Sequence, residues 1–151
     1  MNEKHLKLLM AGKCEELISE FRQLLRKNPN DIPIKRDFAV ILDHCGMLND
    51  AKNLFEECMP FYSSDKVFLL NYANLLYRQG GWDESIKVLQ LVIDPNSYDS
   101  KDADVVSMAH NTIGLIYKNI GDIDNAIAHF KMAIAINAEN KHAHDNLENL
   151  G

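Results

Sequence analysis

The sequence predicts an all-α protein built from about four helical hairpins. Gly12, Gly46, Gly80 and Gly121 are separated by 34, 34 and 41 residues, and similar residues recur at fixed distances from each of them. On both sides of these glycines, apolar residues follow one another at intervals of three and four, which places them on one face of an α-helix. Two amphipathic helices joined at a glycine form an antiparallel hairpin, so the repeated pattern predicts a stack of such hairpins.

The columns of this register indicate which residues pack inside each hairpin. Nine residues after the glycine, every unit has a large apolar side chain: Phe21, Phe55, Leu89 and Phe130. Small residues prevail seven before and five after the glycine: Ala39, Ala73 and Gly114, and Ala51, Ser85 and Ala126. We expect the helices to approach closely at the small residues, and the large side chain to fill the space between them and the next hairpin. The glycine supplies the left-handed backbone that ends a helix without strain.

The register sets approximate bounds for each element within a single domain, residues 1–151. The predicted hairpins span residues 1–31, 32–65, 66–99 and 100–139. Pro33 suits the first turn of a helix, and Asn49, Asp65 and Ser100 are expected N-caps. The polar segment 140–150 predicts a single helix that caps the exposed apolar face of the last hairpin, as stacked repeats require.

The longer spacing before Gly121 places seven extra residues near positions 95–104. Seven residues make about two turns of helix, so the insert is long enough to lengthen the following helix at its N-terminal end. A flexible loop is the alternative. The sequence leaves both interpretations open.

Composition narrows the classes of partner. The chain of 151 residues has 16 basic and 22 acidic side chains, for a formal net charge of −6. Nucleic acids and anionic membranes require a clustered basic surface, so neither is expected as a partner. No run approaches the ~20 apolar residues that span a bilayer, which predicts no membrane insertion.

The cysteines give no sign of a cross-linked or metal-binding framework. Cys14, Cys45 and Cys58 are odd in number and share no CxxC spacing, so neither disulfides nor a zinc site is predicted. Free thiols in the reducing cytoplasm are expected instead.

Residues suited to catalysis or metal binding are not grouped in the sequence. His142 and His144 are the nearest approach to a metal cluster, but residues two apart on a helix point in different directions. The Gly80-Gly81 pair fits the end of a helix and not a phosphate-binding loop. We therefore expect no catalytic residues, no bound metal and no cofactor, and the chain is predicted not to be an enzyme.

The residues of this register resemble the tetratricopeptide repeat, a helical hairpin of 34 residues. The segment Asn111–Phe130, with Gly114, Tyr117, Gly121 and Ala126 at their columns, matches the family pattern closely. The resemblance implies a right-handed superhelical stack in which the first helix of each hairpin lines a concave inner face. It also implies a non-catalytic adaptor that binds a peptide or an amphipathic helix in this groove.

Residues that project into such a groove are expected ten, six and three positions before each glycine, with one flanking residue nine before. The candidate groove residues are Leu6, Arg36, Val40, Asp43, Leu70, Asn71, Asn74, Tyr77, Asn111, Leu115 and Lys118. An Asn side chain both donates and accepts hydrogen bonds, so it can hold a peptide backbone of any sequence. Apolar groove positions accept side chains from an extended segment or a helix. The partner is therefore expected to be a protein or peptide, of unknown identity.

The family resemblance also suggests a second mode of peptide binding. In chaperone-binding members of the family, basic and amide side chains hold a C-terminal carboxylate; Arg36 and Asn71 match this pattern. Val40, Met108 and Thr112 replace its other polar groups and remove most of the charge-assisted hydrogen bonds, so we do not expect such a clamp. The alternative function is structural, as a homo-oligomer or assembly scaffold without a peptide ligand.

Overall fold

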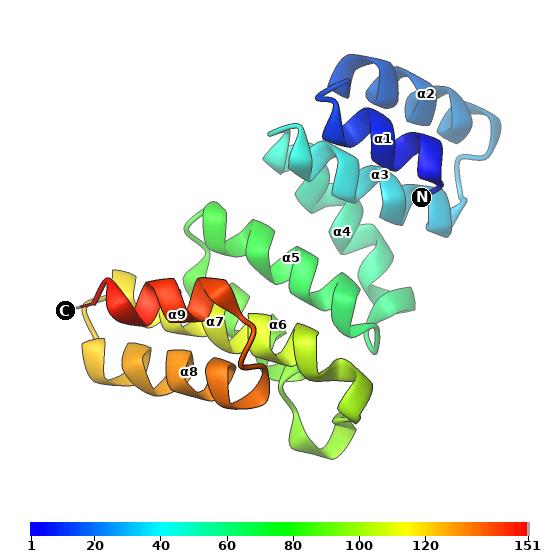
Figure 1. The fold of residues 1–151 in the computed structure, drawn as a ribbon. Coiled ribbons are helices and arrows are strands. Elements are labelled where there is room, and N and C mark those ends of the chain that lie inside the picture. Colours follow the sequence, from blue (N-terminus) through cyan, green and yellow to red (C-terminus); the bar gives the residue numbers. More distant parts are fainter. Residues whose placement is uncertain (151) are drawn as a thin grey trace. The chain divides into compact units, whose positions relative to one another are not determined.

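The computed structural model describes residues 1–150, which form nine α-helices and two short 3-10 helices with no strand among them (Figure 1). This confirms the all-α prediction. The chain divides into two compact units, Met1–Ser63 and Ser64–Gly151, and each is described by itself. That both units act as one domain stays a prediction.

The first unit contains two hairpins. Its helices are α1 (Glu3–Met10), α2 (Cys14–Lys27), α3 (Ile32–His44) and α4 (Leu48–Tyr62). Each helix packs against the next one along the chain. The helices fall within the hairpin bounds that the sequence predicts.

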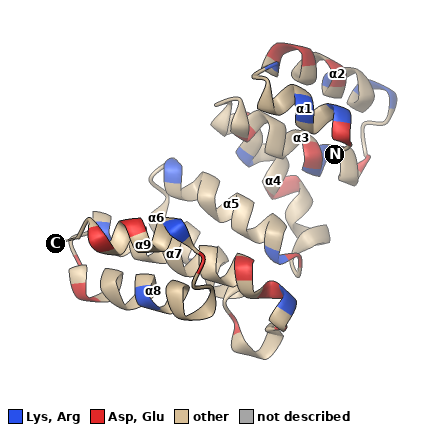
Figure 2. Cartoon of the chain, viewed as in Figure 1, with Lys and Arg blue, Asp and Glu red and all other residues tan. Residues whose placement is uncertain are grey.

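The second unit contains two further hairpins and a terminal helix. Its helices are α5 (Lys66–Arg78), α6 (Trp82–Val92), α7 (Ala103–Asn119), α8 (Ile123–Ile136) and α9 (Lys141–Glu148). The last helix buries Ala143 and contacts both α7 and α8, as expected of a capping helix. Figure 2 shows acidic and basic residues distributed over helices of both units.

The same turn closes all four hairpins. The glycines Gly12, Gly46, Gly80 and Gly121 have φ between 71° and 86°, and no other residue among 1–150 has a positive φ. In each turn the residue after the glycine donates its backbone N–H to the carbonyl four residues before the glycine; Lys13 to Leu8 is the first example, at 2.9 Å. This bond satisfies a carbonyl that the end of a helix leaves without a partner. The predicted equivalence of the four glycines is therefore confirmed.

The predicted close approach of the helices is clearest in the last hairpin. Phe130 is fully buried, and its ring lies against Gly114 of α7. A Cβ atom built on Gly114 would lie 2.6 Å from Cε1 of that ring. Small residues at the corresponding positions of other hairpins, including Ala39 and Ala73, are also fully buried.

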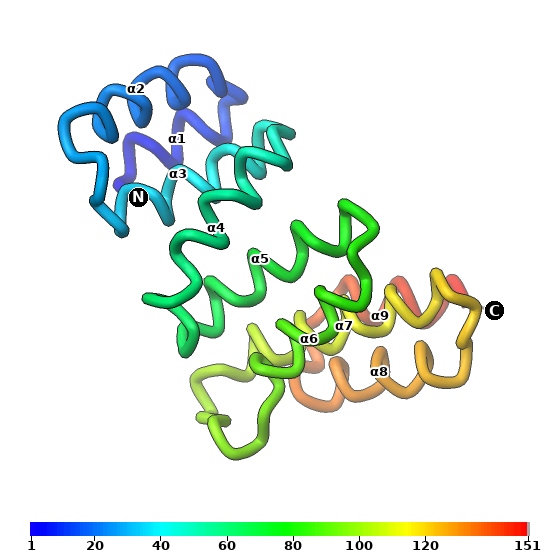
Figure 3. The backbone as a smooth tube through the Cα atoms, turned by 180° about the vertical axis from the view of Figure 1, so that it is seen from behind, coloured from blue at the N-terminus to red at the C-terminus, as the bar shows by residue number. Residues whose placement is uncertain are grey.

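The insert before the fourth hairpin combines the two interpretations that the sequence left open. It forms 3-10 turns at Pro95–Ser97 and Ser100–Asp102, and α7 then begins one turn earlier relative to its glycine than α5 does (Figures 1 and 3). Lys66 Nζ of α5 donates to Ser97 Oγ of the insert at 2.9 Å and to the carbonyl of Val92, the last residue of α6, at 2.7 Å, so it links the insert to both helices.

The predicted helix starts are partly wrong. Asp65 caps α5 through the Phe68 N–H, and Pro33 lies in the first turn of α3, as expected. Asn49 is not a cap, because α4 begins one residue before it. Ser100 is not the N-cap of α7. It is the first residue of a 3-10 turn, and Asp99 caps that turn by accepting the backbone N–H of Lys101.

The expectation of three free thiols is wrong for two of them. Cys14, the first residue of α2, forms a disulfide with Cys45 at the end of α3. The bridge joins the first hairpin to the second within unit 1. Cys58 is free and buried, and burial raises the pKa of its thiol, with the neighbouring Glu57 carboxylate contributing in the same direction.

Gly114→Ala is expected to destabilise the protein when the Phe130 ring is present and to stabilise it when that ring is removed. Phe130→Ala should lower the free energy of unfolding by ~3–5 kcal/mol because it leaves a cavity. Gly114→Ala alone should cost ~1–3 kcal/mol, because its methyl group meets the ring. In the Phe130→Ala background the ring is absent, and Gly114→Ala should stabilise the helix by up to about 1 kcal/mol. Urea denaturation followed by circular dichroism measures all four proteins.

Phe61→Ala is the control, because this ring is 65% exposed and its loss should change stability by less than about 0.5 kcal/mol. Strictly additive effects of the two changes at 114 and 130 would contradict the proposed contact.

Reduction of the disulfide is expected to destabilise unit 1. The bridge closes a segment with a sequence separation of 31 residues, for which about 2–4 kcal/mol of stabilisation is typical. Denaturation with and without dithiothreitol measures the difference. The variant with Cys14→Ser and Cys45→Ser should show no dependence on the reductant, and rapid alkylation of all three cysteines in the untreated folded protein would contradict the pairing.

Candidate functional site

The first helices of the hairpins in unit 2 form a row with the terminal helix. Helix α7 contacts α5 on one side and α9 on the other. Seven of the predicted groove residues lie on two of these helices: Leu70, Asn71, Asn74 and Tyr77 on α5, and Asn111, Leu115 and Lys118 on α7. The row therefore brings the larger part of the predicted site into one unit.

Hydrogen bonds between side chains connect these neighbouring helices. Thr112 Oγ1 of α7 donates to Asn74 Oδ1 of α5 at 2.9 Å. Asn119 Nδ2 of α7 donates to the Tyr77 hydroxyl at 3.1 Å. Asn146 Nδ2 of α9 donates to Asn111 Oδ1 of α7 at 2.8 Å. Each bond joins groups from adjacent helices, so together they fix the orientation of three predicted groove residues.

In all three pairs, the predicted groove residue is the acceptor and retains its own donor. The Nδ2 groups of Asn74 and Asn111 have no hydrogen-bond partner among residues 1–150, and neither has the side chain of Asn71. The Tyr77 hydroxyl accepts from Asn119 and has its own hydrogen left to donate. Unused donors bind carbonyl or carboxylate oxygens, so this face is suited to a ligand rich in acceptors.

The remaining predicted residues of unit 2 frame this array. Leu115 and Lys118 are half-buried, so each still presents part of its side chain. Leu70 is only 4% exposed and offers almost no surface. Leu115 provides an apolar position and Lys118 a positive charge on the helix that carries Asn111.

The other four predicted groove residues lie on α1 and α3 of unit 1. Leu6 is 47% exposed, whereas Val40 and Asp43 are half-buried. The Arg36 guanidinium donates to Asp37 Oδ1 at 2.8 Å and lies 5.2 Å from the centre of the Tyr62 ring. Its charge is therefore already compensated by a neighbouring carboxylate.

Two polar partners in unit 2 were missed by the sequence interpretation. Asn119 lies two residues before Gly121, outside the columns chosen for the groove. Asn146 lies 34 residues after Thr112, so continuing the repeat spacing into the terminal helix would have indicated it. Segment 140–150 was interpreted only as a capping helix, so the column that holds Thr112 was not extended into it.

A second polar cluster lies between α7 and α8. Nδ1 of His110 is 3.0 Å from Nδ1 of His129, and the Tyr117 ring stacks on His129 with centroids 5.5 Å apart. Burial and the neighbouring charge of His129 lower the pKa of His110 to about 4, and burial also lowers the pKa of His129. Two nitrogens at this distance share one proton, so the pair is hydrogen-bonded and neutral near pH 7.

Metal binding finds no further support in the described residues. Within residues 1–150, no three His, Cys, Asp or Glu side chains are grouped as a metal site would require. His144 Nε2 lies 2.8 Å from the Ala138 carbonyl oxygen, whereas His142 is exposed. The two histidines that the sequence singled out thus have separate surroundings.

The histidine pair predicts a pH dependence of stability. The pKa of His110 is lowered to about 4, so between about pH 6.5 and pH 4 the unfolded His110 binds a proton that the folded one does not, and the lowered pKa of His129 acts in the same direction. The free energy of unfolding should therefore fall as the pH decreases through this window. Urea denaturation at several pH values measures the slope. The variant with His110→Gln and His129→Gln removes this contribution, and an unchanged slope in that variant would contradict the assignment to this pair.

Comparison with known proteins supports the repeat architecture. Residues 109–140 match the family model of the tetratricopeptide repeat. No curated protein sequence matches the chain. Among solved structures, the crystal structure of MamA is 18% identical with a TM-score of 0.76, over 99% of this chain and 83% of that one.

Two further structures share the fold. PilF of Pseudomonas aeruginosa is 18% identical with a TM-score of 0.80, over 98% of this chain and 64% of its own. The first tetratricopeptide-repeat domain of Spaghetti (RPAP3), bound to the HSP90 peptide SRMEEVD, is 13% identical with a TM-score of 0.66, over 79% of this chain and 89% of that one. These matches confirm the predicted class, a superhelical stack of helical hairpins. Residues 109–140 are therefore similar in sequence to the tetratricopeptide repeat, and the chain as a whole shares the fold of solved tetratricopeptide-repeat structures.

Proposed function

We propose that the face formed by α5, α7 and α9 binds an extended peptide segment of a protein partner. A protein-interaction role is the general property of the fold. The observation that carries the finer proposal is the array of unused donors on Asn71, Asn74, Tyr77 and Asn111. An extended peptide presents backbone carbonyl oxygens that are free to accept from such donors.

Apolar and charged groups beside the array give the peptide further contacts. Leu115 can receive an apolar side chain, and Lys118 can pair with an acidic side chain or a terminal carboxylate. The solved Spaghetti (RPAP3) domain holds a peptide, which shows that the fold supports this mode of binding. Thr112, which replaces a basic residue of the chaperone-binding pattern, donates to Asn74 instead. Binding at this face would therefore depend on amide groups more than on charged groups.

The four candidate residues of unit 1, Leu6, Arg36, Val40 and Asp43, remain proposed contacts for the same or another segment. We propose no catalytic role for either set, since repeat proteins of this kind are generally interaction modules. A homo-oligomer without a peptide ligand is the alternative, and a monomeric mass by light scattering at high concentration would exclude it.

The cellular compartment stays a prediction. No helix within residues 1–150 is both long and apolar enough to cross a lipid bilayer. The cytoplasmic prediction depended on free thiols, and the Cys14–Cys45 bridge weighs against it, because disulfides persist mainly in oxidising compartments. Trapping of thiols in intact cells with an alkylating reagent would establish the redox state.

A paired substitution on the proposed face tests the function. Affinity capture with the full chain and mass spectrometry would first identify a partner. Asn74→Ala with Leu115→Glu should then lower the affinity for that partner by about tenfold or more, because it removes a donor and places a charge at the apolar position. Gln90→Ala with Met132→Glu is the matched control, since both residues are exposed on α6 and α8, outside the row. Equal capture by all three proteins would contradict the assignment.

A further inference from the structure

The second helix of unit 1 carries two arginines whose charges are not compensated. Arg22 and Arg26 of α2 have no ion pair or hydrogen-bond partner for their side chains among residues 1–150. The third arginine of the unit, Arg36, is paired with Asp37. Residues four apart lie on the same face of a helix, and like charges at this spacing repel each other. In a chain of net charge −6, two adjacent free guanidinium groups are an unusual local feature.

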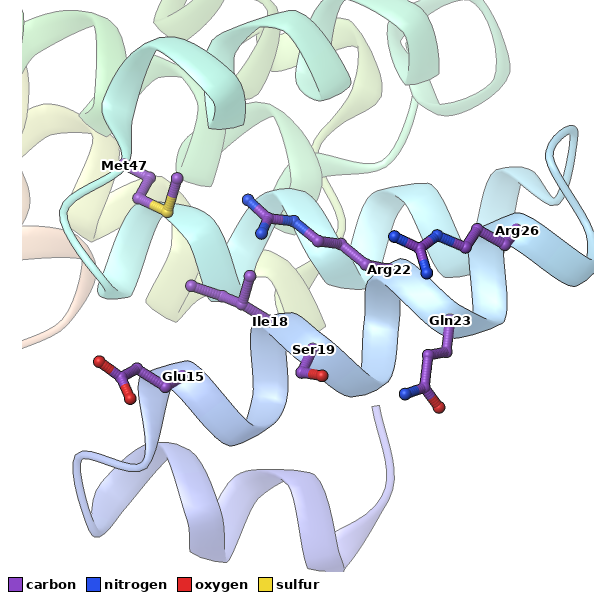
Figure 4. Close-up of a pocket in the computed structure, with 7 residues that line it drawn as sticks. All are labelled: Glu15, Ile18, Ser19, Arg22, Gln23, Arg26 and Met47. Carbon is purple, nitrogen blue, oxygen red and sulfur yellow. The ribbon is translucent and has the colours of Figure 1, made fainter.

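The two arginines line one side of a pocket in unit 1. The pocket has a volume of about 450 Å³ and lies between α2 and the turn that joins α3 to α4. Its lining residues are Glu15, Ile18, Ser19, Arg22, Gln23, Arg26 and Met47. Figure 4 shows Ile18, Arg22 and Arg26 in a row along α2, with both arginine side chains extended in the same direction. The wall thus changes from apolar at Ile18 and Met47 to cationic at Arg22 and Arg26.

A neighbouring hollow extends the surface toward α4. It has a volume of about 310 Å³, shares Arg22 with the first pocket, and has Phe38, Leu42 and Leu54 among its lining residues. Asp50 also lines it. An anion is therefore favoured between Arg22 and Arg26, away from Asp50 and from Glu15 at the start of α2, and apolar groups are favoured toward Ile18, Met47 and Leu54.

The disulfide holds the walls of the first pocket in place. Cys14 directly precedes Glu15, and Cys45 lies two residues before Met47. The bridge therefore links the start of α2 to the turn on the opposite wall. A pocket with cross-linked walls is preorganised, which reduces the entropy lost on binding.

We propose that this surface, defined by Ile18, Arg22, Arg26 and Met47, binds an acidic segment of a protein partner in which carboxylate side chains stand beside an apolar residue. Guanidinium groups bind carboxylates with two parallel hydrogen bonds, and two adjacent arginines can hold one or two such groups. The apolar residue of the segment packs on Ile18 and Met47. This site is separate from the row of α5, α7 and α9 and does not depend on the function proposed there.

A charge-reduced variant tests the proposal with a defined probe. The probe is a short fluorescein-labelled peptide with the repeated sequence Leu-Glu-Glu, whose binding to the full chain is measured by fluorescence anisotropy. Arg22→Gln with Arg26→Gln should weaken binding by about tenfold or more, the loss expected when charge-assisted hydrogen bonds are removed. Lys13→Gln with Lys27→Gln is the matched control: it removes the same charge from the two ends of α2 outside the pocket, and should leave affinity within about twofold. Circular dichroism confirms that both variants are folded.

Binding measurements with other probes distinguish the proposed ligand from other anions. A peptide with Gln in place of Glu, inorganic phosphate, and vesicles containing phosphatidylserine should each bind much more weakly than the acidic peptide. Amide shifts of the labelled protein should move in α2 and around Met47 when the acidic peptide is added. The proposal is overturned by equal weakening in the two variants, by no binding at millimolar peptide, by equal binding of phosphate or vesicles, or by shifts confined to α5, α7 and α9. Asn74→Ala with Leu115→Glu should leave binding of the acidic peptide unchanged. A failure of the present proposal can therefore be distinguished from a failure of the function proposed for α5, α7 and α9.

Discussion

The architecture depends on one backbone constraint, the left-handed glycine that ends the first helix of every hairpin. With φ near +80° at this position, the next N–H can turn back onto the carbonyl four residues before the glycine. Any residue with a Cβ atom would be strained in this conformation, so the glycine sets where each first helix ends and where its partner starts. Two helices fixed in this way must meet at the same distances along their length, and this meeting explains the buried small residues and the ring of Phe130 on Gly114.

The row of helices in unit 2 produces its polar face. Because α5, α7 and α9 stand in a row, side chains at related positions come within hydrogen-bond distance of the next helix. These contacts use the acceptor atoms of Asn74, Asn111 and Tyr77. Half-buried amides in register would otherwise lose solvent without gaining partners, which is costly. In each of these residues the acceptor oxygen has a partner, and only the hydrogen-bond donor remains unused.

The sequence predicted the helical hairpins and their turns because glycines and small residues have strict positions in the repeat. The start of α7 was harder to predict, because Asp99, Ser100 and Asp102 are all good caps and the choice among them depends on the 3-10 turn that precedes the helix. The disulfide was missed for another reason. Cys14 and Cys45 are far apart in sequence and obey no known spacing; only the packing of α2 against α3 brings the two sulfur atoms together. Candidate groove residues followed from the family pattern, whereas their hydrogen-bond partners required the positions of neighbouring helices.

The cross-link between consecutive hairpins also has a mechanical consequence. When a chain is pulled from its ends, the residues enclosed by a covalent bridge cannot extend even after they lose their structure. A separation of 31 residues withholds about 100 Å of contour length, at 3.3–3.6 Å per extended residue. Under tension, the unfolded chain of the oxidised protein would therefore extend less than that of the reduced protein, although both contain the same helices.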